Sequence, residues 1–513
     1  MRGKESNGLN LKEVISYSLL PFGMATIFSV TSTALNMYFT DILGLSMGMV
    51  SIIMFVSKIW DAFNDPIMGS IVDKTKTRFG KCRPYIFWMS LPLAAALALL
   101  FAPIDFGASG NFVYAFIAYI LFYTVNTSVD IPNQGLPSLI FPEEKQRVKA
   151  IAVSNILGSL GSILPSVLFF TIAGLWGREN EKQGYFLSAV IFAVMAGLPV
   201  FISAFGFKEK VKIPQEKTAF REAFKIVYKD KNFVCLVIAF IFSQAAFIGS
   251  IYLPYFTKWN CAGVVPVDEL CLWIKNTFGI SISLTSEGLL TPVIQIGSGI
   301  AFIVSTALVP PLLKKMDKKT LWIWVSVLGV AANIACYIIG VWIFPYNTVT
   351  GLIVYTVMRF FASFPNGMTT VLATAMFSDM IESFEVRTGK RLEGTVFSIR
   401  SLVNKTALSV FNWFVLSVIS WFGYDSKVMM MLTDNLSKPL ITSTTQAVIY
   451  NGVNYTTLLN VIFFMLTAFS AIGLFLQTVP MFFYKVNEKE QNEKLRIYRE
   501  AQEKTVLEES EVS

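Results

Sequence analysis

Charged and amide side chains gather within one strongly apolar stretch near the start of the chain. Lys58, Asp61, Asn64 and Asp65 are spaced three and four residues apart, so on an α-helix they share one face. In a dry site, two carboxylates this close cannot both stay ionised without a cation. They must share a proton, pair with a lysine or bind a metal ion. Because one lysine cannot neutralise both, we interpret this face as a site for a transported monovalent cation, and Na+, Li+ and H+ all stay open. The alternative is an ion-paired stripe that holds helices together.

Two prolines strengthen this interpretation. Pro66 has no amide hydrogen, so the carbonyl of Ala62 loses its usual helical donor and becomes a candidate cation ligand. A second apolar stretch repeats the pattern, because Pro132 frees the carbonyl of Ser128 and Asp130 is the only carboxylate there. Both stretches therefore combine carboxylates with carbonyl groups that lack a helical donor.

A third apolar stretch near the C-terminus carries cationic side chains. Arg400 and Lys405 point about 140° apart around a helix, and Ser401 lies on the Lys405 face. We expect one of the two cations to face the carboxylates of the first half. For Arg400, snorkelling toward the inner boundary and pairing with Asp130 are open alternatives. For Arg359, in a neighbouring stretch, we expect snorkelling.

The elements that position these residues must be membrane helices. Hydrophobic residues make up 54% of the 513 residues and charged residues only 15%, whereas soluble domains carry about 25% charged residues. A membrane-spanning helix needs roughly 20 mostly apolar residues. We therefore predict an all-α membrane protein with twelve transmembrane helices, over 15–39, 47–72, 84–104, 111–138, 148–175, 184–206, 232–257, 288–313, 320–343, 347–378, 392–422 and 455–484.

The distribution of basic residues predicts how these helices are oriented. Of the 42 lysines and arginines, 32 lie in the segments on the side of both termini, 6 lie in the opposite loops and 4 lie inside helices. Cytoplasmic loops are rich in Lys and Arg, so both termini are expected in the cytoplasm of a multi-pass protein of the cell (inner) membrane. The expected organisation is an N-terminal six-helix half (1–206), a cytoplasmic linker (207–231), a C-terminal six-helix half (232–484) and a cytoplasmic tail (485–513).

The composition also excludes several kinds of chemistry. The chain has no histidine, which removes imidazole as a metal ligand or proton relay. Its five cysteines form no CxxC pair, so zinc chemistry is not expected. We therefore expect no enzyme, no cofactor and no metal beyond the transported cation. We also expect no nucleic-acid partner, because the net charge of +8 is explained by basic residues in the inner loops. Cys261 and Cys271, in one predicted outer loop, are either a disulfide or two free thiols.

The loop after the second predicted helix has the residues of an inner gate. Gly69 permits close helix approach, Asp73 ends the helix, and Arg78, Gly80 and Lys81 form a tight basic loop. This loop is similar to the inner-loop signature of the major facilitator superfamily.

Three sequence blocks carry a closer resemblance, at 38–46, at 60–69 with its continuation to residue 84, and at 130–132. They resemble the glycoside-pentoside-hexuronide:cation symporters of the major facilitator superfamily, in particular their melibiose permease-like members. The resemblance implies the major facilitator fold, whose substrate site lies between two halves near the middle of the membrane. It also implies that Lys405 links the sugar and cation sites, and that the cation is bound by Asp61, Asn64, Asp65 and Thr127.

The substrate side departs from the family pattern. Ala25 stands where a sugar-binding aspartate is expected, Gln134 replaces a tryptophan, Asn155 replaces an arginine, and Arg400 is an added charge. A less negative pocket with an added arginine suits a carboxylate, so the hypothesis is an acidic sugar such as a hexuronide. The substrate-binding residues are expected to be Asp130, Gln134, Asn155, Arg400, Ser401 and Lys405.

We therefore predict a monomeric secondary active symporter that imports a sugar or glycoside with a cation by alternating access. Its partners would be the small-molecule substrate, the monovalent cation and the lipid bilayer. The alternatives are a carrier of lysolipids or another non-sugar substrate with the same fold, and a transporter-like sensor that binds sugar without moving it.

Overall fold

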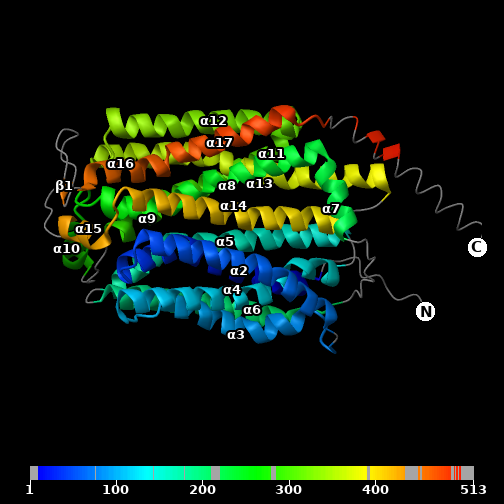
Figure 1. Cartoon of the computed structure of the whole chain (residues 1–513), viewed down its shortest axis with the longest axis horizontal. Helices are drawn as coiled ribbons and strands as arrows, with labels where there is room; N and C mark the ends of the chain where they lie inside the picture. The colour runs from blue at the N-terminus through cyan, green and yellow to red at the C-terminus, as the bar shows by residue number, and fades with distance from the viewer. Residues whose placement is uncertain are drawn as a thin grey trace, which may run out of the picture.

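The computed structural model describes most of the chain (Figure 1). The described residues are 10–75, 77–141, 144–177, 180–209, 220–278, 285–389, 393–433, 449–450, 453–486, 490, 493–494 and 496–497. Apolar stretches fold into helices because a helix satisfies its own backbone hydrogen bonds where water is absent.

Six long helices form the first part of the molecule, which we call the N-terminal bundle. Its elements are α1 (Leu11–Met37) with the π-helical turn η1 (Tyr38–Ile42), α2 (Met47–Lys74), α3 (Arg83–Leu100), α4 (Gly107–Ile140), α5 (Glu144–Trp176) and α6 (Glu181–Gly206). Helices α2 and α4 continue through Pro66 and Pro132, as the sequence predicts. The carbonyl groups that face these prolines thus lie within helices.

The second part, the C-terminal bundle, also contains six long helical segments. They are α8 (Lys231–Ile248) with η2 (Gly249–Tyr252), α9 (Leu253–Tyr255) and η3 (Phe256–Asn260), then α11 (Ser286–Leu313), α12 (Lys318–Ile338) with η4 (Ile339–Ile343), α13 (Val349–Thr388), α14 (Glu393–Trp421), and α16 (Tyr455–Leu466) with α17 (Ala468–Phe483). Shorter elements are α7 (Phe220–Lys229), α10 (Val267–Phe278), α15 (Ser426–Thr433), and the antiparallel strands β1 (Ile449–Tyr450) and β2 (Val453–Asn454).

Each predicted membrane span coincides with one of these long helical segments. Within the described ranges, nine helices are long and apolar enough to cross a membrane. The other three are α2 and α13, which carry charges in their interiors, and α8, whose path is interrupted by η2. The least accurate boundary is that of α13, which runs ten residues beyond the predicted end at 378.

Packing separates the two bundles (Figure 1). In the N-terminal bundle, α1 packs on α5 and α6, α3 on α4 and α6, and α2 on α4. In the C-terminal bundle, α11 and α12 pack on α13, and α17 packs on α8 and α12. The bundles meet mainly where α2 contacts α14 and where α5 contacts α11. The predicted domain boundaries stay a prediction.

Helix α7 lies inside the segment that the sequence analysis treats only as a linker. Its Val227 side chain is buried in the core of the C-terminal bundle. Phe224 and Tyr228 are exposed, and their rings stack with centroids 6.2 Å apart. The helix is therefore amphipathic. The many charges in this segment make that pattern hard to recognise from the sequence.

The loop predicted to be an inner gate is fixed by a residue that follows α6. The carboxylate of Glu209 accepts hydrogen bonds from the backbone N–H groups of Lys81, Cys82 and Arg83 at 2.7, 2.8 and 2.9 Å. These groups start α3, where a helix has unpaired N–H donors and attracts negative charge. Gly80 precedes them with φ +111°, and a Cβ there would collide with the Glu209 carboxylate.

The other gate residues have different surroundings. The guanidinium of Arg78 lies 4.7 Å from the ring centroid of Phe79. Gly69 has no atom within 4 Å of the position that its Cβ would occupy. The side chain of Asp73 lies outside the described part of the structure. The gating role of these residues stays a prediction.

Replacing Gly80 by alanine is expected to destabilise the protein. The left-handed φ strains any other residue, and the added methyl group displaces Glu209 from the start of α3, so the cost is about 1–3 kcal/mol. Thermal unfolding of the purified protein in detergent measures the effect. The matched control is Gly69→Ala, which should melt no lower than the wild type. A Gly80→Ala variant that melts with the wild type would contradict this account.

Candidate functional site

Lys405 on α14 stands among three carboxylates of the N-terminal bundle. Its Nζ atom lies 2.6 Å from Oδ2 of Asp65, 3.4 Å from Oδ2 of Asp61 and 3.7 Å from Oδ2 of Asp130. The first two acids come from α2 and the third from α4. The structure therefore brings together residues that are far apart in the sequence, across the contact between α2 and α14.

Each of two acids also has a hydrogen-bond donor on α4. Thr127 donates from Oγ1 to Oδ1 of Asp61 at 2.9 Å, and Gln134 donates from Nε2 to Oδ2 of Asp130 at 3.0 Å. Asp61 is buried, while the side chains of Asp65 and Asp130 are about one-fifth exposed. Asp61 is thus buried and hydrogen-bonded, whereas the other two acids are partly exposed.

Two buried polar atoms of α2 have no hydrogen-bond partner among the described residues. They are Oδ1 of Asp65, the residue paired with Lys405, and Nδ2 of the adjacent Asn64. Buried polar groups in proteins are nearly always paired, so unpaired ones at a cluster of charges point to a ligand. A carboxylate oxygen is also the kind of atom that hard cations prefer.

The net charge of this cluster is negative. The ammonium group of Lys58 lies 4.0 Å from the ring centroid of Tyr123, where it is stabilised by the aromatic face. When every group is ionised, Lys58 and Lys405 offset two of the three carboxylates. The remaining negative charge in a partly buried site favours the binding of one monovalent cation.

Arg400 is placed differently from Lys405. Its Nη2 atom donates to Oγ1 of Thr374 at 2.9 Å, and its guanidinium lies 5.5 Å from the ring centroids of both Phe240 and Phe377. None of the carboxylates in the described ranges pairs with it, so the expected alternative of pairing with Asp130 is wrong. The C-terminal bundle holds this cation through aromatic rings and a hydroxyl group, which leaves its charge uncompensated.

Two other predicted substrate residues are less closely associated with the cluster. Ser401 is half-buried on α14, one turn before Lys405. Asn155 is exposed on α5, where its carbonyl accepts a hydrogen bond from Ser159. Neither has a polar contact with the Lys405 cluster among the residues that the structure describes.

The prediction for Arg359 is wrong. It is buried and does not extend toward the boundary of the membrane. Its Nη1 atom lies 3.5 Å from the carbonyl oxygen of Leu466, at the break between α16 and α17. A carbonyl freed at that break receives the guanidinium, which is a structural role.

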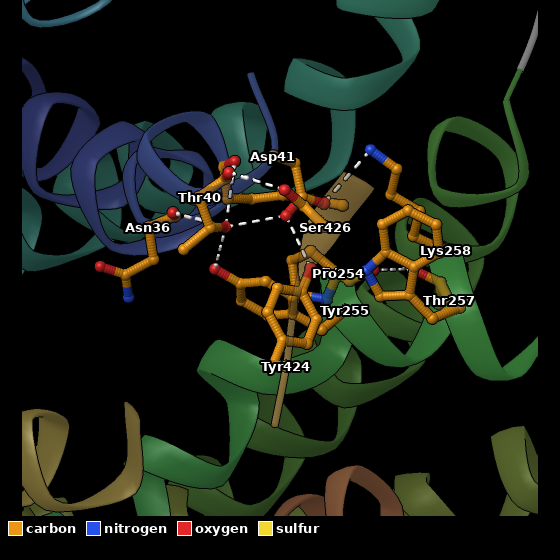
Figure 2. A network of polar contacts seen from close by, with 11 residues as sticks. Asn36, Thr40, Asp41, Pro254, Tyr255, Thr257, Lys258, Tyr424 and Ser426 are labelled. Carbon is orange, nitrogen blue, oxygen red and sulfur yellow. Dashed lines mark hydrogen bonds and ion pairs between the residues drawn. The ribbon is translucent and has the colours of Figure 1, made fainter. Parts of the chain in front are cut away.

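The structure also contains a second buried charge cluster, which the sequence analysis did not identify (Figure 2). Oδ2 of Asp41 lies 3.3 Å from Nζ of Lys258, and Oδ1 of Asp41 accepts a hydrogen bond from the Tyr424 hydroxyl at 2.6 Å. Burial and the nearby Asp41 raise the pKa of Tyr424 well above its usual value, so its hydroxyl keeps the proton that it donates. The one feature of the sequence that could have indicated this cluster was Asp41, a charged residue at the end of an apolar stretch.

The cysteines near this second cluster are free. Cys261 is fully buried directly after η3, and Cys271 is half-buried on α10. Of the two alternatives, the structure has two free thiols. Burial raises the pKa of Cys261, so its thiol is unreactive while it stays covered.

Comparison with known proteins identifies the family. The MFS/sugar transport protein family matches residues 16–259 and 287–488. The chain belongs to this family. Within it, the chain is 25% identical over 419 residues to a protein of Escherichia coli (strain K12) provisionally named glycoside/cation symporter YagG, covering 82% of this chain and 84% of that protein. The glucuronide carrier protein homolog of the same organism is 21% identical, covering 81% of this chain and 85% of that protein.

A solved structure supports the fold independently. The crystal structure of a mutant of nucleoside transporter NupG aligns with a TM-score of 0.61 and 11% identity, covering 91% of this chain and 99% of that one. Together with the family match, this confirms the all-α major facilitator fold. The resemblance to the glycoside-pentoside-hexuronide:cation symporters is likewise confirmed. The chain is a membrane transporter of the sugar-transport type and not an enzyme.

Replacing Lys405 by methionine is expected to destabilise the protein by about 2–4 kcal/mol, because three carboxylates are left without their shared cation. Adding Asp65→Asn to this variant should recover part of the loss, since one uncompensated charge is removed. Thermal unfolding of both single variants and the double variant measures this coupling. Strictly additive losses would show that Lys405 and Asp65 do not interact as the 2.6 Å distance indicates.

Proposed function

We propose that the chain is a cation-coupled secondary active symporter that imports a sugar or glycoside by alternating access. The observation that carries the proposal is the position of Lys405, which the C-terminal bundle places among Asp61, Asp65 and Asp130 of the N-terminal bundle. A cation and a substrate that act on these shared contacts would each change the affinity for the other, and this coupling is reciprocal.

The coupling cation, Na+, Li+ or H+, would bind at Asp61, Asn64, Asp65 and Thr127. The unpaired Oδ1 of Asp65 supports this assignment, because it is a carboxylate oxygen free to accept a cation. Binding there would weaken the hold of Asp65 on Lys405. The lysine would then be free to shift toward Asp130 and the substrate.

The substrate would bind on the other side of Lys405. Asp130 and Gln134 can accept and donate hydrogen bonds to sugar hydroxyl groups, and Lys405 can donate to them. Arg400 would supply a positive charge for a carboxylate, which suits an acidic sugar such as a hexuronide. Its support by Phe240 and Phe377, without a described acidic partner, favours this role. Asn155 and Ser401 would complete the pocket in a conformation that closes around the substrate.

Two alternatives differ in the outcome that they predict. A lysolipid or other non-sugar carrier would accumulate no sugar under any gradient. A transporter-like sensor would bind sugar without flux. The proposed symporter is a monomer in the cell membrane with both termini in the cytoplasm, where Gly69, Asp73, Arg78, Gly80 and Lys81 form the inner gate.

Uptake into proteoliposomes tests coupling. Neutral glycosides, pentosides and hexuronides are offered with an imposed sodium or lithium gradient, and then with a proton gradient alone. Accumulation under one gradient is expected to fall at least about tenfold in Asp61→Asn and Asp65→Asn, because each loses a charged cation ligand. Asp105→Asn is the control, since Asp105 is exposed, pairs with Lys182 at 3.2 Å and accepts from the N–H of Gly107 at 3.3 Å, away from the site. Full accumulation in both site variants would overturn the proposed cation site.

Substrate charge is tested separately with Arg400→Gln. If Arg400 binds the carboxylate, the KM for a hexuronide should rise about tenfold or more, while the KM for a neutral glycoside changes little. Thr374→Val is the companion variant, because it removes the hydroxyl that orients Arg400 and should give a smaller rise. Equal effects on charged and neutral substrates would show that Arg400 has only a structural role.

A further inference from the structure

The second charge cluster joins the two bundles at one end of the molecule. Asp41 and Thr40 belong to η1 of the N-terminal bundle, whereas Lys258 lies in η3 and Tyr424 follows α14 (Figure 2). We call this cluster the Asp41 network. Figure 1 places it at the end that carries α9, α10 and α15, opposite α7.

Several hydrogen bonds accompany the ion pair of Asp41 with Lys258. Oγ1 of Thr40 lies 3.0 Å from the hydroxyl of Tyr255, and Ser426 donates from Oγ to the carbonyl of Thr40 at 3.1 Å. Trp259 donates from Nε1 to the Tyr424 hydroxyl at 2.8 Å. Every one of these side chains except that of Lys258 belongs to a buried residue. Both bundles therefore contribute polar groups to contacts that exist only while this end is closed.

A second contact closes the same end beside the network. Thr171, near the end of α5, donates from Oγ1 to the carbonyl of Gly288, near the start of α11, at 2.6 Å. A Cβ on Gly288 would lie 3.2 Å from the carbonyl oxygen of Phe170, so the two helices approach closely there. Two separate polar contacts between the bundles thus lie at this one end.

We propose that the Asp41 network is the gate of the end predicted to face outward, and that the structure has this gate closed. Asp41 acts as its centre, because it accepts from Tyr424 and pairs with Lys258 at the same time. Opening the gate separates η1 from η3 and transfers both charges to water. The closed state is stabilised only while both charges are present, since one charge buried alone is strongly unfavourable.

This role is distinct from the proposed cation site around Asp61 and Asp65. Asp61 lies fourteen residues along α2 from Met47, which corresponds to about 21 Å of helix from this end. The Asp41 network therefore controls access to the membrane-embedded cluster without contacting it. The inference concerns access alone, so its test needs no transported substrate and is independent of the proposed sugar and cation.

The chain carries its own reporter for this gate. Cys261 follows η3 directly and is fully buried, with its N–H donating to the carbonyl of Phe256 at 3.1 Å. A maleimide can reach this thiol only when the gate opens. Cys336 on α12 is also buried, in the apolar core that contains Cys261, but it makes none of the contacts of the network described above, so its labelling reports general loosening of the C-terminal bundle.

The experiment measures alkylation of both cysteines by N-ethylmaleimide, in proteoliposomes, with quantification of each labelled peptide by mass spectrometry. N-ethylmaleimide crosses membranes, so the orientation of the protein does not matter. Asp41→Asn should raise the rate at Cys261 about tenfold or more, because Lys258, whose side chain is only 10% exposed, loses the carboxylate at 3.3 Å. Tyr424→Phe, which keeps the ion pair, should raise it a few-fold. Neither variant should change the rate at Cys336.

Asp105→Asn is the matched control, because it removes an acid from an exposed ion pair within the N-terminal bundle and should leave Cys261 protected. If Asp41→Asn fails to fold, Cys336 reacts as well, and Tyr424→Phe then decides. Wild-type protection of Cys261 in the folded variants would overturn the proposal. Equal increases at Cys261 and Cys336 in Tyr424→Phe would also overturn it.

Discussion

The arrangement of the whole membrane interior depends on one ammonium group shared by three carboxylates. Charges inside a membrane helix are costly unless they are paired, so Asp61, Asp65 and Asp130 need a cation wherever the helices place them. Lys405 supplies it at 2.6–3.7 Å, but from the other bundle. This requirement fixes how α14 lies against α2 and α4. With Lys58 also counted, the cluster keeps one net negative charge when every group is ionised, which supports the proposed binding of a small cation there.

Two layers of polar contact thus connect bundles that otherwise meet through apolar surfaces. Lys405 connects them in the interior, and Asp41 connects them at one end. In the proposed transport cycle, a change of access would separate one layer while the other reorganises. Separating either layer exposes charged groups, so each separation has a free-energy cost that ligand binding would have to offset. A cation at Asp65 would offset part of that cost in the interior, because it replaces the lysine as the partner of the carboxylate.

Local sequence patterns predicted the long helices and the shared face of α2. Contacts between segments that are distant in the chain could not be predicted in the same way. The spacing of Asp61 and Asp65 placed them on one face, and the apolar lengths gave every long helix. The sequence could not show that Glu209 caps the start of α3, that Arg359 reaches Leu466, or that Asp41 meets Lys258, because each contact joins segments distant in the chain. Lys258 lies one residue beyond the predicted span 232–257, because its helical path continues through η2 and η3 beyond the apolar stretch. The assignment of ligands to particular side chains stays a prediction.

The two cations of α14 show how one helix can serve two purposes. Lys405 faces carboxylates, so its charge is used within the protein. Arg400 is turned toward Phe240 and Phe377, whose rings stabilise a guanidinium without neutralising it. An arginine held by aromatic faces keeps its donors directed by Thr374 and its full positive charge. In the proposed pocket, Lys405 and Arg400 would distinguish an anionic substrate from a neutral one by charge, while Asp130 and Gln134 would distinguish substrates by hydrogen bonding.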